Sequence, residues 1–451
     1  MKKLIATLKN IWSIEELRKR ILFTLLLVFV YRVGCYITLP GINPTDINDN
    51  APAGLLGILN MFAGGAFSRA SIFALGVMPY ISASIFMQLA GIVVPQVAKM
   101  QREESGRRTI NQYTRYLTVL VTAFQSAAYV TYLTHTQQYA RAIAPEYSPF
   151  MFWLSTVTVL TAGTLFVMWM GEKITDKGIG NGTSLIIMVG ILARLPQSLI
   201  QEFSAKTVNG GGGLLIFMIE MAFFIAIIVG LILLTQGVRR IPLNYARRII
   251  GSTNAAREVS GSRDFIPLKV NAAGVMPIIF AQAIMFIPAT VAGFAASDST
   301  QGIVRALSDH TSLWYNVIYA VMVIAFTYFY VALIFNPTEI ADNLKRNNSF
   351  IPGVKPGEPT ADYIGTIMDR ITLPGAAFLA LAGILPGIAA LLGVTSGFAS
   401  FYGGTSMLIG VGVILDTLQQ IESHLLMRHY DGLMKTGRIA GRTAVGSGTP
   451  I

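Results

Sequence analysis

The chain has 451 residues, of which 53% are hydrophobic and only 13% are charged, with a formal net charge of +11. A soluble domain carries about 25% charged residues, so this composition excludes an ordinary soluble enzyme and indicates a polytopic membrane protein. The positive charge lies between the apolar stretches, which argues against a direct nucleic-acid function. The single cysteine, Cys35, excludes an internal disulfide framework.

The apolar stretches predict ten membrane-spanning helices. The first follows six basic residues, as in a signal peptide, but it has no small-residue cleavage site, so we expect it to be retained. The ten expected spans cover residues 21–39, 71–94, 115–134, 150–170, 182–200, 213–236, 270–294, 313–335, 373–393 and 404–422.

Lysine and arginine are distributed unevenly among the segments outside these spans. The N-terminus and alternate connections hold 27 of them, whereas the opposite side holds four, namely Arg69, Arg141, Lys206 and Arg305. Positive residues concentrate on the cytoplasmic side of a membrane protein. Both termini are therefore predicted to be cytoplasmic.

A short apolar stretch at 54–63 lies between the first two spans and is too short to cross a bilayer. Gly64 and Gly65 follow it, and glycine permits the sharp reversal that re-entry into the membrane requires. Two interpretations stay open. The stretch could be a helix lying on the lipid surface, or it could fold back into a cavity covered by protein.

The second expected span contains Pro79 in its middle, together with serine hydroxyls that a plain lipid anchor does not need. Proline removes a backbone hydrogen bond, so neighbouring helices or water must satisfy the freed carbonyl. The Gly-Val-Met-Pro sequence at 76–79 recurs at 274–277, in the seventh span. In both copies a valine two residues before the proline and an isoleucine two residues after it share one helix face. These pairs are Val77 with Ile81 and Val275 with Ile279.

A second repeat links the fifth and tenth spans, because Gly-Thr-Ser begins both, at 182–184 and at 404–406. Each repeat joins corresponding positions of two five-span halves, and an odd number of spans inverts the second half relative to the first. We therefore expect an N-terminal half, 1–200, which includes the short segment at about 54–69, and a C-terminal half, 201–451. Equivalent residues of inverted halves can meet only near the membrane midplane.

Two connections on the predicted cytoplasmic side, at about 237–269 and 336–372, are long and polar. The first carries seven basic residues, and the second contains several prolines and glycines, which form rigid turns. Basic loops can simply fix the topology and contact anionic lipid. The length and stiffness of these two loops instead favour docking of a large partner.

The sequence contains no pattern that indicates catalysis, a cofactor or a metal. The four histidines lack metal-ligand spacing, and the glycine run at 210–213 lacks the lysine of a phosphate-binding loop. An ion-coupled secondary transporter also uses inverted repeats, but it usually places carboxylates at the midplane. Glu220 and Asp416 are the main acidic residues in the spans, and we expect Asp416 to pair near a helix end. A membrane scaffold would need no paired proline helices.

Several stretches, in order along nearly the whole chain, resemble the SecY family of protein-conducting translocase channels. They are SIFALGVMPYISASI (71–85), MGEKITDKGIGNGTSLI (170–186), NYARR (244–248), ADNLK (341–345), PGVKPGE (352–358) and FYGGTSMLI (401–409). The resemblance implies an all-α channel of the bacterial inner membrane, with two inverted five-helix halves around an hourglass pore. Unfolded secretory polypeptides would cross it, and apolar segments would leave sideways into lipid between spans two and seven.

The resemblance also implies site residues. The pore ring would be Val77, Ile81, Thr183, Ile187, Ile279 and Ile409, and the plug would include Leu55, Leu56, Ile58, Leu59, Asn60, Met61 and Phe62. The lateral gate would include Ser84, Gln88, Gln282 and Phe286, and the docking surface would include Arg239, Arg240, Arg247, Arg248, Lys345 and Lys355. Branched aliphatic residues suit a pore for any polypeptide, since they offer no hydrogen bonds and close by excluding water. The alternative is that they only pack helices together.

Four of these positions depart from the family's preferences or allow two interpretations. Thr183 replaces a branched aliphatic residue, and Lys355 replaces an arginine and so loses the bidentate fork. Gln88 and Gln282 could close the gate through hydrogen bonds of roughly 1 kcal/mol, or could satisfy backbone freed by the prolines.

The resemblance implies several partners and no cofactor. The SecE and SecG subunits would bind the channel, and the SecA ATPase or a ribosome would dock on the long loops. Polypeptides bearing signal sequences would be the cargo.

Overall fold

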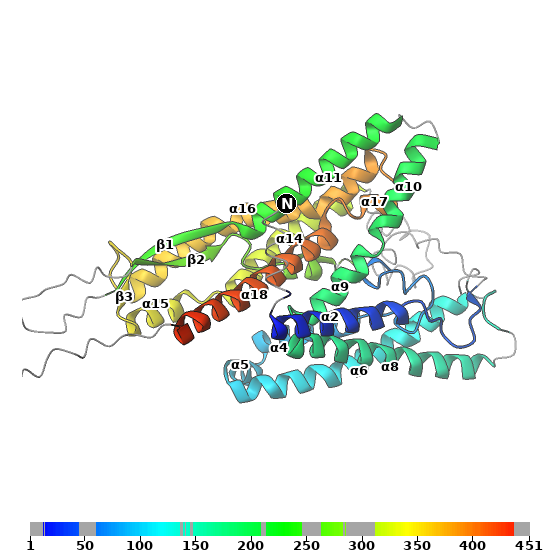
Figure 1. The fold of residues 1–451 in the computed structure, drawn as a ribbon, viewed down its shortest axis with the longest axis horizontal. Helices are drawn as coiled ribbons and strands as arrows, with labels where there is room; N and C mark the ends of the chain where they lie inside the picture. The colour runs from blue at the N-terminus through cyan, green and yellow to red at the C-terminus, as the bar shows by residue number, and fades with distance from the viewer. Residues whose placement is uncertain are drawn as a thin grey trace, which may run out of the picture.

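The computed structural model describes residues 12, 14–44, 60–135, 139, 141–144, 148–208, 213–245, 263–282, 285 and 312–436 (Figure 1). Within these residues the protein is mostly helical, and six helices are long and apolar enough to cross a membrane, or seven if one bent pair is counted as a span. The first and tenth expected spans coincide with further helices, and the seventh is described only as far as residue 285. The prediction of a polytopic helical membrane protein is confirmed.

The helices of the first 180 residues pack together in the lower part of Figure 1. They are α2 (Glu15–Gly34), α4 (Met78–Val93), α5 (Pro95–Arg102), α6 (Glu104–His135) and α8 (Pro149–Lys177). α6 packs between α4 and α8, and α2 packs on α8. α4 and α5 are bent by 101° relative to each other, at the break between Val93 and Pro95.

The later helices form a second group in the upper part of Figure 1. They are α11 (Gly213–Gln236), α14 (Leu313–Ile334), α16 (Glu358–Leu391), α17 (Ser396–Ala399) and α18 (Gly404–Thr436). α9 (Gly182–Leu192) lies between the groups and packs against both α8 and α18, whereas α10 (Leu195–Val208) packs against α11 and α17 of the second group. α11 is apolar on all sides and mostly exposed, which suits a helix surrounded by lipid, and its bounds are those predicted.

The structure corrects the predicted position of Pro79 within its helix. α4 begins at Met78, so Pro79 is the second helical residue, where its missing N–H breaks no helical hydrogen bond. Residues 72–77 form turns, and Gly76 near their end has a φ of 54°, which favours glycine. The expectation that Pro79 frees a backbone carbonyl in the middle of its helix is therefore wrong.

The second Gly-Val-Met-Pro copy has the same backbone course as the first. A helix begins at Met276 after turns, and Gly274 has a φ of 64°. The Val77 carbonyl accepts a hydrogen bond from Ile81 N–H at 3.1 Å, and the Val275 carbonyl accepts one from Ile279 N–H at 3.3 Å. The Gly-Thr-Ser copies behave alike too, since each begins a helix, α9 or α18. Both sequence repeats are thus repeats of local structure.

The two long polar loops form a joint subdomain that was not predicted. β1 (Val238–Tyr245) pairs antiparallel with β2 (Arg263–Lys269), and β3 (Ser349–Phe350) of the second loop pairs with the other edge of β1. α15 (Pro337–Arg346) precedes β3, and α16 begins at Glu358, fifteen residues before the expected span. The sheet adds strands outside the membrane helices to an otherwise helical fold.

The described apolar side chains gather in three clusters. The first lies between α2, α8, α9, α18 and residues 61–77, and the second lies among α11, α14, α16 and α18. The third lies beneath the sheet, where Ile241, Leu243 and Leu268 pack with Ile351 and Ile364. The first cluster contains most of the predicted pore residues.

Candidate functional site

Aliphatic side chains from three segments meet inside the first cluster. Val77 precedes α4, Ile187 lies on α9 and Ile409 lies on α18, and their exposed fractions are 5%, 7% and 5%. Ile81 and Val275 are partly buried and pack against the same cluster. These residues, which we name the waist, therefore face the protein interior rather than lipid.

Two of the six predicted ring residues lie outside the waist. Thr183 is half-buried in the first turn of α9, and its Oγ1 lies 3.1 Å from where a Cβ would stand on Gly171 of α8. Its hydroxyl thus packs against α8. Ile279 is half-buried and does not belong to the cluster of the waist. The complete six-residue ring stays a prediction.

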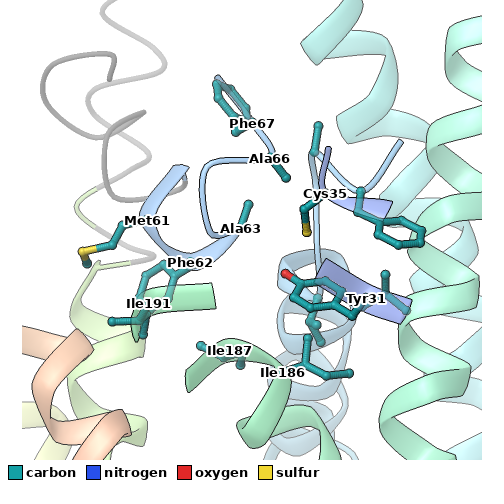
Figure 2. Close-up of a cluster of buried hydrophobic side chains, with 14 of the residues drawn as sticks. Tyr31, Cys35, Met61, Phe62, Ala63, Ala66, Phe67, Ile186, Ile187 and Ile191 are labelled. Carbon is teal, nitrogen blue, oxygen red and sulfur yellow. The ribbon is translucent and has the colours of Figure 1, made fainter. Parts of the chain in front are cut away.

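The described end of the predicted plug packs against the waist (Figure 2). Leu55, Leu56, Ile58 and Leu59 lie outside the described residues, whereas Asn60, Met61 and Phe62 are helical and at most 7% exposed. An interfacial helix would expose its apolar side to lipid. For residues 60–62, burial favours the alternative in which the chain folds back into the protein.

The backbone after the plug touches α9 directly. A Cβ on Gly64 would lie 2.9 Å from Gly190 Cα, and a Cβ on Gly190 would lie 2.7 Å from the Phe62 carbonyl oxygen. Ile187 is three residues before Gly190 and so lies on the same side of α9, and Phe62 lies beside Ile191 in Figure 2. Close contact of two backbones here depends on the two glycines.

The predicted gate residues lie at partly buried positions. Ser84 and Gln88 are half-buried on α4, Gln282 is half-buried, and Phe286 lies outside the described residues. The Tyr330 hydroxyl of α14 donates to Gln88 Oε1 at 3.5 Å. Because Pro79 breaks no helical hydrogen bond, Gln88 is not needed to satisfy backbone freed by that proline.

An apolar seam beside the predicted gate was missed. Ile85 and Leu89 of α4 pack against the third cluster, which contains Phe280 of the helix that begins at Met276 and Tyr330 of α14. The Phe280 ring centroid is 6.2 Å from that of Tyr330. The i, i+4 spacing of Ile85 and Leu89 could have identified this face from the sequence.

The predicted docking residues that the structure describes are all exposed. Arg239 and Arg240 lie on β1, Lys345 lies on α15 and Lys355 lies in the turn before α16, whereas Arg247 and Arg248 lie outside the described residues. Arg240 Cζ is 4.7 Å from the Phe265 ring centroid. β1 joins both loops in one sheet, and that sheet packs on the third apolar cluster. The basic residues of the two loops are therefore held by one packed subdomain.

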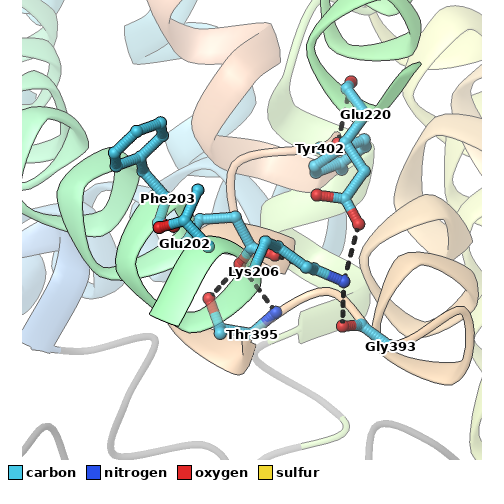
Figure 3. Close-up of polar contacts among 8 residues, drawn as sticks. Glu202, Phe203, Lys206, Glu220, Gly393, Thr395 and Tyr402 are labelled. Carbon is cyan, nitrogen blue, oxygen red and sulfur yellow. Dashed lines mark hydrogen bonds and ion pairs between the residues drawn. The ribbon is translucent and has the colours of Figure 1, made fainter. Parts of the chain in front are cut away.

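A buried ion cluster that was not predicted joins α10, α11 and the chain before α17 (Figure 3). Lys206 Nζ lies 2.9 Å from Glu220 Oε1 and 3.7 Å from Glu202 Oε1, and it donates to the Gly393 carbonyl at 2.9 Å. Glu202 is fully buried and accepts from both N–H and Oγ1 of Thr395. Glu202 and Lys206 have the i, i+4 spacing of a helical ion pair, but Gly393 and Thr395 lie 187 and 193 residues from their partners, so local sequence could reveal only part of the cluster.

A polar cavity of about 500 Å³ lies between the start of α9 and the middle of α18. It is lined by Asn181, Asp416, Gln419, Gln420, Ser423 and His424. At a rise of about 1.5 Å per residue, Asn181 stands about 9 Å along α9 from Ile187, and Asp416 stands about 10 Å along α18 from Ile409. The cavity therefore opens to one side of the waist. Within the described ranges, no group of His, Cys, Asp or Glu is arranged to hold a metal.

The fold defines a polytopic helical membrane protein whose buried waist lies where its two helix groups meet. The SecY family model matches residues 71–418, and the chain belongs to the SecY family. It is 40% identical to the protein translocase subunit SecY of Chlamydia muridarum over 464 residues, covering 97% of this chain and all of that one. It is 43% identical to the subunit of Thermus thermophilus over 447 residues, covering 96% and 99% of the two chains.

Solved structures of protein-conducting channels share this fold. A structure described as a protein-conducting channel matches with a TM-score of 0.64 at 16% identity, covering 93% of this chain and 95% of that one. Sec61 from the canine ribosome–channel complex of the endoplasmic reticulum matches with a TM-score of 0.61 at 15% identity and the same coverage. The predicted family and channel fold are confirmed, and the chain is a channel subunit of the Sec translocon.

Proposed function

We propose that the chain forms a passive pore through which unfolded polypeptides cross the bacterial inner membrane. The waist carries this proposal, because Val77, Ile187 and Ile409 from three segments belong to one buried cluster, and Ile81 packs against it. Branched aliphatic side chains bind no particular sequence and close by excluding water. The polar cavity about 9–10 Å from the waist along α9 and α18 would offer a hydrated approach.

The short segment before Gly64 acts in this proposal as a plug. Of its described residues, Met61 and Phe62 share a cluster with the waist, and the Phe62 carbonyl lies against Gly190 of α9. The apolar contacts of Met61 and Phe62 can separate without breaking covalent bonds. The plug would block the waist in the idle channel and move aside when a polypeptide enters.

The lateral exit is proposed to lie between α4 and the helix that begins at Met276. Both contribute side chains to one apolar cluster, through Ile85 and Leu89 on one side and Phe280 on the other. An apolar seam opens into lipid at lower cost than a polar one. Sufficiently apolar segments would pass through it by partitioning. Ser84, Gln88, Gln282 and Phe286 stay predicted gate residues beside it.

The matching local structures support two inverted halves, 1–200 and 201–451, with both termini in the cytoplasm. Equivalent elements begin with the same residues, and the equivalent helices α9 and α18 pack against each other. This is the geometry expected where a pseudo-twofold axis passes between repeats.

The energy for transport would come from a partner. Exposed basic residues on the packed sheet support docking of a SecA ATPase or a ribosome, and we propose SecE and SecG as accompanying subunits. The ion cluster of Lys206 does not favour a secondary transporter, since Lys206 is bonded to two protein groups at 2.9 Å and is not poised for a substrate. We infer that the chain itself catalyses no reaction.

Depletion of the protein from growing cells tests this function. Secretory precursors should accumulate uncleaved in the cytoplasm, and a plasmid copy of the gene should restore their export. Normal export after the protein has disappeared would overturn the proposal.

A further inference from the structure

The turn that follows the plug is held by side chains from several elements. Within residues 64–71, three backbone carbonyls accept hydrogen bonds from side chains far away in the sequence. The bonds run from Arg32 Nη1 to Gly64 (3.3 Å), from the Tyr129 hydroxyl to Phe67 (2.7 Å) and from the Tyr139 hydroxyl to Ser68 (3.1 Å). The base of the plug is therefore fixed to α2, α6 and the chain near residue 139.

Arg194, between α9 and α10, holds the same turn from another side. Its Nη2 donates to Ser68 Oγ at 3.2 Å. Its guanidinium also covers Gly65, where an added Cβ would lie 3.0 Å from Arg194 Nε. Arg32 covers the neighbouring glycine in the same way, since a Cβ on Gly64 would lie 2.6 Å from its Nη1. Two guanidinium groups thus occupy the space that the two glycines leave.

These contacts reach the plug itself through Asn60. Ser68 N–H donates to Asn60 Oδ1 at 3.0 Å, and Gly65 N–H donates to the Asn60 carbonyl at 2.8 Å. The result is a chain of hydrogen bonds from Arg194 through Ser68 to Asn60. Apolar contacts of Met61 and Phe62 favour burial without fixing direction, whereas hydrogen bonds from a charged guanidinium fix position.

We propose that Arg32 and Arg194 are positioning residues that anchor the Gly64–Gly65 turn and hold the plug in its closed place against α9. The inference rests on the proposed pore function and goes beyond it by naming the side chains that set the stability of the closed state. Movement of the plug then pivots at the two glycines, whose φ values of 64° and 89° mark the reversal of the chain.

Hydrogen exchange of the full-length protein in lipid nanodiscs tests the anchor without requiring transport. Arg32→Gln and Arg194→Gln should each speed amide exchange in residues 65–70 by at least about tenfold, because a hydrogen bond from a charged group is lost. Arg141→Gln removes an exposed arginine from the same predicted side and should leave this exchange unchanged. Arg194→Lys retains a charge and a donor and should lie between the wild type and Arg194→Gln.

Ion conductance of the idle protein in planar bilayers provides the second measurement, with deletion of residues 55–62 as the reference for an unplugged pore. Both glutamine variants should conduct more than Arg141→Gln and the wild type. Unchanged exchange would overturn the anchor. If the glutamine variants exchange faster but do not conduct, while the deletion variant does conduct, the role of the two arginines in holding the plug is overturned. A deletion that does not conduct would instead refute the proposed pore.

Discussion

Lys206 and Lys19 show how burial changes the contribution of an ion pair to stability. Both pair with a glutamate four residues earlier, but the side chain of Lys206 is 11% exposed and that of Lys19 is 73% exposed. Lys206→Met leaves Glu202 and Glu220 without their cation, and removing one partner of a buried ion pair costs about 3–5 kcal/mol. We expect the unfolding temperature in detergent to fall markedly for Lys206→Met.

Lys19→Met is the matched control for that substitution. An exposed pair contributes about 0–1 kcal/mol, so its unfolding temperature should stay close to that of the wild type. Equal effects of the two substitutions would show that the cluster in Figure 3 does not stabilise the fold.

Ile187 tests the waist at the level of one side chain. Ile187→Asn places an amide in the apolar constriction, where it can hold water that aliphatic side chains exclude. We expect idle ion conductance in planar bilayers to rise several-fold above the wild type, and the variant to remain folded in the membrane. Ile200→Asn, at a position 67% exposed on α10, should leave conductance unchanged. If Ile187→Asn leaves idle conductance unchanged, this residue only packs helices together.

At the scale of whole elements, the contact between the plug and α9 depends on a missing side chain. Gly190→Ala would place a Cβ 2.7 Å from the Phe62 carbonyl, so the two backbones must separate, at a cost of about 1–3 kcal/mol. Gly410→Ala in α18 meets no atom within 4 Å and should stabilise its helix by about 0.5–1 kcal/mol. Thermal unfolding of the two variants should therefore shift in opposite directions, and a shared direction would contradict this packing.

Elements that depend on local pattern were predictable, and those that depend on distant contacts were not. The uniformly apolar α11 has its predicted bounds, Gly213–Gln236. The predicted start of the second span, residue 71, differs from the start of α4 at Met78. Mostly apolar residues continue through 71–77, but Gly76 turns the backbone there. Similarly, the repeated spacing singled out Val77, Ile81 and Val275, which lie in the waist, and Ile279, which does not. The sheet instead requires β1 to pair with β3, about 100 residues away in the sequence.

At the scale of the whole molecule, the sheet collects basic residues from two loops at one end, and this end is either a docking surface or a lipid contact. Arg239→Glu combined with Arg240→Glu reverses charge on β1 while leaving the buried Ile241 and Leu243 in place. If a ribosome or motor docks here, its association should weaken at least about tenfold in sedimentation or fluorescence binding at low salt. Lys177→Glu, exposed in another predicted cytoplasmic connection, should weaken it much less. A phosphate-rich bilayer and a docked partner would compete for the same exposed guanidinium groups. If the double substitution leaves partner binding undiminished but weakens binding to anionic vesicles, this surface is assigned to lipid instead.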